Sequence, residues 1–270
     1  MRHSHSAQLN RQGNDYFSRG FYTEAYQCYV KALEADRKSG DQRAMVVTLG
    51  NLGNICAVSG QREQAKTYYQ EVLERQKLLG DDRGIGATLA NLGNLHVDAG
   101  DWERGRAYYL EALDMMNRCK DDAAKAILFS DLGLVAKETK QFDHALEYYS
   151  QSIALMRRVG NHAGQADVYK MMARMYCAWE RYDDAIACAQ TSLAIAERLR
   201  DELRMGGAWY VLAGCHEALG HDEDAARLLR HVVRIDQKYG LPKLEENTRR
   251  LATIRERLEC HPLKETARHE

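Results

Sequence analysis

Residues 49–60 read LGNLGNICAVSG and residues 89–100 read LANLGNLHVDAG, so a leucine–glycine–asparagine phrase recurs after 40 residues. The same spacing continues in both directions from this pair. Two columns of small residues follow it along the chain: Gly13, Gly53, Gly93, Gly133, Ala173 and Ala213, and Ala25, Ala65, Gly105, Ala145, Ala185 and Ala225. Self-similarity at a fixed period of this length is typical of repeat proteins.

Each 40-residue unit contains two helical patterns. In residues 42–81, apolar or small residues recur at i, i+3, i+4 and i+7 from Leu49, and a similar stripe begins at Ala65. Gly60 separates the two patterns and can adopt the left-handed conformation that ends a helix. Aspartate or asparagine stands at the unit boundaries, as in Asp41 and Asn161, where its side chain can cap the next helix.

The composition agrees with helices throughout. Residues 1–241 contain no proline, and alanine and leucine far outnumber the β-branched residues. We therefore predict an all-α chain, a right-handed α-solenoid of six helical hairpins closed by a capping helix. The predicted segments are a flexible N-terminus (1–6), six repeats filling residues 7–241 (2–41, 42–81, 82–121, 122–161, 162–201 and 202–241), a capping helix (242–258) and a tail (259–270).

Charge and motifs exclude several classes of function. The chain has 38 Lys and Arg against 39 Asp and Glu, which argues against a dedicated nucleic-acid binder. No apolar run approaches the length of a membrane-spanning helix. Seven cysteines without a CxxC pair indicate free thiols and a cytoplasmic location rather than a disulfide framework. No HExxH, GxSxG or GxxxxGK[ST] string occurs, so we expect no enzyme, no cofactor and no metal site.

The repeat resembles the tetratricopeptide repeat family. The family's small residue in the first helix matches the column of Gly53, and its alanine–aromatic pair in the second helix matches Ala65 with Tyr69. The 40-residue length and the Leu-Gly-Asn phrase are most similar to the Pins/LGN spindle-orientation scaffolds. This resemblance covers roughly residues 7–258 and implies stacked hairpins whose first helices line a concave groove.

Asparagines recur on the groove-facing side of these first helices. Asn51 and Asn54 share one face, as do Asn91 and Asn94, and Asn14 continues the column. Asparagine is a mediocre helix former, but its amide can pair with the backbone of an extended peptide. The resemblance to LGN-like scaffolds extends that role to Asn14, Asn54 and Asn94. The alternative is that these side chains bond the adjacent helix and orient the stack.

The last three units present charged and aromatic side chains on the same face. Candidate residues here are Asp131, Lys170, Arg174 and Tyr210, which could select a charged partner segment or form an ordinary solvated surface. The sequence thus favours a non-catalytic scaffold that binds a peptide segment of a partner protein. The alternatives are a regulatory sensor of short peptides that acts through a partner, and a self-assembling structural array.

Overall fold

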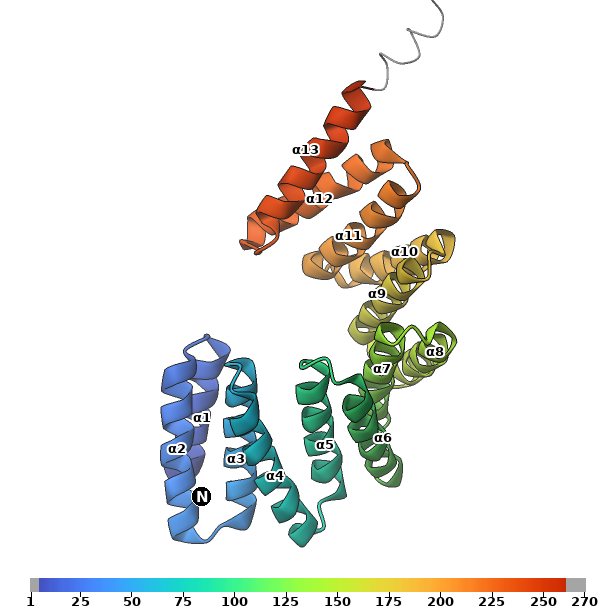
Figure 1. Ribbon diagram of the computed structural model, residues 1–270. Coiled ribbons are helices and arrows are strands. Elements are labelled where there is room, and N and C mark those ends of the chain that lie inside the picture. Colours follow the sequence, from blue (N-terminus) through green and yellow to red (C-terminus); the bar gives the residue numbers. More distant parts are fainter. Residues whose placement is uncertain (1–4, 261–270) are drawn as a thin grey trace, which may run out of the picture. The chain divides into compact units, whose positions relative to one another are not determined.

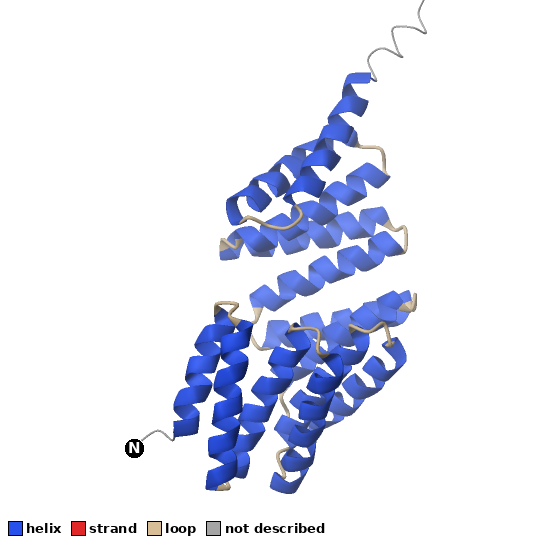
Figure 2. Ribbon diagram, turned by 60° about the vertical axis from the view of Figure 1, so that its left-hand side comes forward, coloured by secondary structure: helices blue, strands red, loops and turns tan. Residues whose placement is uncertain are grey.

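The computed structural model describes residues 5–260, and all secondary structure in this range is helical (Figure 2). The helices are α1 (His5–Ser18), α2 (Tyr22–Ser39), α3 (Gln42–Val58), α4 (Arg62–Leu79), α5 (Asp82–Val97), α6 (Trp102–Arg118), α7 (Asp122–Glu138), α8 (Phe142–Arg158), α9 (His162–Ala178), α10 (Tyr182–Leu199), α11 (Glu202–Ala218), α12 (Asp222–Tyr239) and α13 (Leu244–Cys260). From α3 to α11, the first helix of each hairpin begins 40 residues after the previous one. The all-α repeat fold predicted from the sequence is confirmed.

The chain forms two compact units, with the boundary between Leu128 and Phe129 inside α7. In unit 1, α1 packs on α2, α3 on α4 and α5 on α6 (Figure 1). In unit 2, α9 packs on α10 and α11 on α12, and α13 covers α12. Each unit therefore consists of successive helical hairpins, and α13 contributes a final layer to unit 2.

The turns use left-handed backbone, as the glycine columns predict. Gly20, Gly60, Gly100 and Gly220 have φ between 74° and 80° in the turns inside hairpins. Four other residues share this left-handed conformation: Lys120, Lys140, Glu180 and Arg200. These four stand where the sequence columns lack glycine. The repeat geometry therefore imposes the left-handed turn even where the residue disfavours it.

The predicted helix caps are present at the unit boundaries. The carboxylates of Asp41, Asp81, Asp121 and Asp201 and the side-chain oxygen of Asn161 each accept a hydrogen bond from the backbone N–H three residues later, at 2.8–3.0 Å. Each bond satisfies one of the backbone donors that a helix start leaves unpaired. The start of every first helix from α3 onwards is thus encoded by one side chain.

The small residues of the first helices allow close packing against tyrosine. A Cβ added at Gly53 would lie 2.5 Å from the Tyr69 ring, and one at Gly133 would lie 2.5 Å from the Tyr149 ring. Both tyrosines are almost fully buried. The glycine column therefore exists because the ring of the second helix occupies the space of a side chain.

The ends differ from the expected boundaries. Of the segment 1–6, which was predicted to be flexible, the structure describes His5 and Ser6. Both belong to α1, and Ser6 is buried; residues 1–4 lie outside the described residues. The capping helix begins at Leu244 and continues to Cys260, and the rest of the predicted tail lies outside the described residues. None of the helices between residues 5 and 260 has the length and apolar character needed to cross a bilayer.

Candidate functional site

The asparagine column of unit 1 is bonded to the tyrosine column. The hydroxyl groups of Tyr29, Tyr69 and Tyr109 donate hydrogen bonds of 2.7, 2.8 and 2.6 Å to the side-chain oxygens of Asn14, Asn54 and Asn94, respectively. Burial raises the pKa of Tyr69 to about 12, so its hydroxyl stays protonated as a donor. The same pair thus joins the two helices of three consecutive hairpins.

These bonds leave the other half of each amide available. Asn54 and Asn94 are exposed, and within the described residues their Nδ2 groups have no hydrogen-bond partner. The tyrosine hydroxyl fixes which amide atom points inward, so the –NH₂ group, with two N–H donors, is the half that remains for a ligand. The bonds to tyrosine agree with a role in orienting the hairpin, and they leave outward N–H donors that are compatible with binding.

Asn51 and Asn91 occupy different surroundings. Asn51 Nδ2 donates to Asn10 Oδ1 at 3.0 Å, and Asn10 in turn donates to Thr48 Oγ1 at 2.8 Å. Thr48 then donates to the buried carboxylate of Asp36 at 2.6 Å. Asn51 is therefore part of a polar chain between α1, α2 and α3. Asn91 is half-buried and has no such contact within residues 5–260.

The fourth repeat interrupts the asparagine–tyrosine pairing. Position 134 is leucine, and the hydroxyl of the fully buried Tyr149 has no hydrogen-bond partner among the described residues. Asp131 stands in the column of Asn51 and Asn91 and is half-buried, and burial raises the pKa of its carboxyl to about 7. The asparagine pattern of unit 1 therefore does not continue into unit 2.

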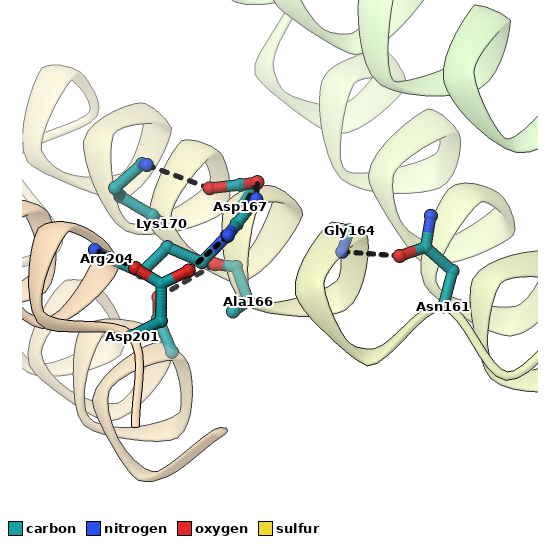
Figure 3. Close-up of polar contacts among 8 residues, drawn as sticks. Asn161, Gly164, Ala166, Asp167, Lys170, Asp201 and Arg204 are labelled. Atoms are coloured by element: carbon teal, nitrogen blue, oxygen red, sulfur yellow. Dashed lines mark hydrogen bonds and ion pairs between the residues drawn. The ribbon is translucent and has the colours of Figure 1, made fainter. Parts of the chain in front are cut away.

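Lys170 belongs to a charged network between α9 and α11 (Figure 3). Its Nζ lies 3.0 Å from Asp167 Oδ1, while Arg204 Nη2 lies 2.9 Å from Asp167 Oδ2. Arg204 also pairs with Asp201, the residue that caps α11. Lys170 is thus neutralised by a neighbour, and its aliphatic stem covers Gly207.

Arg174 and Tyr210 lie together at a cavity in unit 2. This cavity of about 310 Å³ is mainly apolar, with Leu203, Val232 and Ile235 among its lining residues, and Arg174, Tyr210 and Lys243 also line it. The Tyr210 ring has two cations at 5.1 Å from its centroid, Lys243 Nζ and Arg250 Cζ. Arg250 is paired with Glu217, whereas Arg174 and Lys243 have no ion-pair partner among residues 5–260. Arg174 and Lys243 thus bring two positive charges to the lining of this cavity, which also includes the Asp236 carboxylate.

The sequence analysis missed the contribution of α13 to this cavity. Asn247 lines it and is 1% exposed, its Nδ2 donates to Asp236 Oδ2 at 2.7 Å, and its Oδ1 has no partner among the described residues. The pattern of the predicted capping helix does not single out this asparagine, because a polar residue normally marks the solvent side of a helix. The break Gly240-Leu241-Pro242 was the available signal, since it redirects the chain and places Lys243 at the cavity.

The chemical groups of the two sites can be compared with those of a metal centre. Among the described residues, no group of three or more His, Cys, Asp or Glu side chains could hold a metal ion. The two arrangements instead offer hydrogen-bond donors in unit 1, and an apolar cavity with cations at its edge in unit 2. Such groups are suited to contact with an extended or partly apolar segment.

The repeat is also found by comparison with known sequences. The family model described as "Tetratricopeptide repeat" matches residues 5–78, 45–118, 84–158, 124–198 and 165–238, which together span most of the chain. No curated protein sequence matches the chain.

Several solved structures have a similar backbone. BtubC (BKLC) from P. vanneervenii aligns over 86% of this chain and 92% of its own, with a TM-score of 0.68 and 19% identity. A signal-transduction ATPase with a tetratricopeptide repeat sensor from Pyrococcus horikoshii aligns over 92% of this chain but 38% of its own (TM-score 0.71, 19% identity). A Rap protein complexed with Competence and Sporulation Factor aligns over 94% of this chain and 76% of its own (TM-score 0.67, 16% identity). At these identities the likeness concerns the fold alone.

Proposed function

The chain belongs to the tetratricopeptide repeat family, and from this premise we propose that it is a non-catalytic scaffold that binds a segment of a partner protein. The first helices supply the binding face within each unit. Within unit 1, the asparagines hold the main chain of a bound segment. Within unit 2, taken by itself, the cavity beside Tyr210 accepts a side chain of a bound segment.

The observation that carries this proposal is the orientation of Asn54 and Asn94. Each side-chain oxygen accepts a hydrogen bond from a tyrosine hydroxyl. Each amide therefore already presents its N–H donors outward before a partner binds. Pre-organised polar groups lose less conformational freedom when they bind a partner. Peptide carbonyl groups are the acceptors that such donors recognise whatever the partner's side chains are.

The charges of unit 2 indicate which partner segment fits there. Arg174 and Lys243 lie at a cavity whose lining is mainly apolar. An apolar side chain flanked by an acidic residue, or by a terminal carboxylate, matches this combination. Asp131 and Lys170 do not line this cavity, and in this proposal they adjust which charged residues of a partner segment are tolerated.

A pull-down from native lysate tests the proposal. The wild-type chain is compared with the double variant Asn54→Ala/Asn94→Ala and with Asn117→Ala, an exposed asparagine at the end of the second helix α6. We expect one or more proteins retained by the wild type and by Asn117→Ala, and lost in the double variant. The wild type and the two variants are compared by helical circular dichroism beforehand.

Equal retention by all three chains would contradict a role for the asparagine face in binding. Loss in the double variant together with a lower helical signal would assign these residues to folding instead. Arg174→Ala is then tested on the retained partner, and we expect weaker binding that becomes less sensitive to salt.

A second candidate function is a sensor of a short free peptide. The cavity of about 310 Å³ beside Tyr210 is within the size range of ligand pockets and favours this alternative. A similar fold occurs in the Rap protein complexed with Competence and Sporulation Factor. Calorimetric titration with short peptides ending in an apolar residue would separate the two functions. A sensor must bind the free peptide tightly before it acts through a partner, whereas the scaffold binds its segment as part of a partner protein.

The proposal includes the finer expectations from the sequence. It places the protein among Pins/LGN-like scaffolds in the cytoplasm, with protein partners rather than nucleic acid or membrane. Self-assembly is the less favoured arrangement, because α13 covers α12 with buried Leu251 and Ile254 and leaves charged residues such as Glu245 and Arg249 outward. Monomers in light scattering at micromolar concentration would agree with this.

A further inference from the structure

Two cysteines of unit 2 face each other across neighbouring first helices. Cys177 lies near the end of α9 and Cys215 near the end of α11, and their Sγ atoms are 3.2 Å apart. A disulfide needs about 2.0 Å between sulfurs, so a small rotation of the two side chains would bring them to bonding distance. No other pair of sulfurs among the described residues is this close.

The two thiols differ in chemical character. A hydrogen bond from Cys215 lowers the pKa of Cys177, and the positive charge of Arg174 acts in the same direction. Cys215 is fully buried, and its hydrogen bond to Cys177 together with burial raises its own pKa. Cys177 is thus the more readily ionised thiol, and the thiolate is the form that reacts with oxidants.

Cys177 is also accessible to a small oxidant. It is partly exposed and lines a cavity of about 470 Å³ together with Arg174, Tyr210 and Gly214. A glycine at position 214 leaves this side of the cavity open apart from the Arg250 side chain. A peroxide molecule can therefore reach the Cys177 sulfur, whereas Cys215 is buried.

From this geometry we propose that Cys177 and Cys215 are a thiol–disulfide modification site that links α9 to α11 when a peroxide is present. The Cys177 thiolate attacks one peroxide oxygen, the O–O bond breaks, and Cys177 becomes a sulfenic acid with release of hydroxide. The Cys215 sulfur then attacks the Cys177 sulfur, an S–S bond forms, and water leaves with the Cys215 proton. Overall, two thiols are oxidised and one hydrogen peroxide is reduced to two waters.

The other cysteines provide internal controls. Cys188 is also partly exposed, on α10, but burial raises the pKa of its thiol to about 11. Cys28 and Cys56 are buried, and Cys119 is exposed with no thiol at hydrogen-bond distance among the described residues. The reaction with peroxide is therefore expected to be selective for one pair.

Peptide mapping of the full-length protein tests the site. Purified chain is treated with hydrogen peroxide at low protein concentration, alkylated, and digested with trypsin without reduction. Each cysteine of interest falls in its own fragment: Cys177 in 175–181, Cys188 in 182–198 and Cys215 in 205–227. We expect a linked 175–181/205–227 species that disappears with dithiothreitol, and the same species at unchanged yield in Cys188→Ser.

The variants distinguish the two roles. In Cys215→Ser, Cys177 should remain as a sulfenic acid that dimedone traps, whereas in Cys177→Ser, Cys215 should stay a free thiol. Arg174→Ala removes a trypsin site, so Cys177 then falls in fragment 171–181. Formation of the linked 171–181/205–227 species should slow several-fold, and the slowing should diminish as pH rises and the Cys177 thiol ionises by itself.

Two results would overturn the proposal. One is wild-type protein in which fragments 175–181 and 205–227 stay separate after peroxide treatment. The other is linkage through Cys188 at comparable yield. The wild-type mapping alone decides these outcomes, so the test does not depend on the folding of a variant or on the identity of a binding partner.

Discussion

The hydroxyl of Tyr69 donates a 2.8 Å hydrogen bond to the side-chain oxygen of Asn54, which lies on the other helix of the same hairpin. The same relationship holds for Tyr29 with Asn14 and for Tyr109 with Asn94. It connects the helix packing of unit 1 to the face that we propose for binding. Under that proposal, the position of one hydroxyl group affects both the stability of the hairpin and the recognition of a partner.

Removing that hydroxyl should have opposite effects in two repeats. Tyr69→Phe breaks the bond to Asn54 and is expected to destabilise the chain by about 1 kcal/mol. Tyr149→Phe removes a buried hydroxyl without a partner among the described residues, and is expected to be neutral or stabilising by up to about 1 kcal/mol. Chemical denaturation of both variants measures the difference. Equal losses would show that the tyrosine hydroxyl in the second repeat is not stabilised by Asn54.

Glycines of the same helix should respond differently to a methyl group. Gly53→Ala places a Cβ 2.5 Å from the Tyr69 ring and is expected to cost about 1–3 kcal/mol of unfolding free energy. Gly50→Ala meets open space within α3 and is expected to stabilise by about 1 kcal/mol, because alanine is the better helix former. Thermal unfolding of this matched pair separates packing from helix propensity. A destabilised Gly50→Ala would contradict the open surroundings of that position.

The turn residues with left-handed backbone carry avoidable strain. Lys140 and Glu180 have φ of 59°, a conformation that costs a residue with a Cβ roughly 1–2 kcal/mol. Lys140→Gly and Glu180→Gly should therefore each raise the unfolding free energy by about 0.5–1 kcal/mol, after the greater flexibility of glycine in the unfolded chain is included. Lys31→Gly, inside α2, is the control and should destabilise by about 1 kcal/mol. Losses in all three would rule out relief of backbone strain.

Asp131 should make stability depend on pH. Its pKa is raised to about 7 by burial, so ionisation is harder in the folded state than in the unfolded chain. The resulting loss of stability is absent below pH 4, grows between pH 4 and 7, and is complete above pH 7.

Asp131→Asn restores the residue type found at Asn51 and Asn91 and removes this titration. It is expected to stabilise the chain at pH 8 by up to about 4 kcal/mol, since one pKa unit corresponds to about 1.4 kcal/mol. At pH 4 the wild type and variant should have nearly the same stability. An equal gain at both pH values would attribute the effect to packing instead of charge.

The repeat and its hairpins could be predicted because their determinants are local. Asp41 caps a helix through a backbone group three residues away, and Gly60 ends one through its own φ. The spacing of 40 residues then repeats these local rules along the chain. Hydrogen bonds between side chains of different helices were harder to predict. Asn51 and Asn54 share one helix face in the sequence pattern, yet Asn54 accepts a bond from a tyrosine and Asn51 donates one to Asn10.

The sequence by itself determined the helical hairpins, their caps and the small residues that let helices approach, since each depends on contacts within a turn or between matching columns of the repeat. The tertiary structure alone decided which amide atoms point outward, that Arg174, Tyr210 and Lys243 meet at one cavity, and that Cys177 lies against Cys215. Those relationships depend on how side chains from separate helices pack together. The 40-residue period aligns the asparagine and tyrosine columns but does not say which amide atom accepts the bond, and the cavity residues and the Cys177–Cys215 pair do not belong to matching columns.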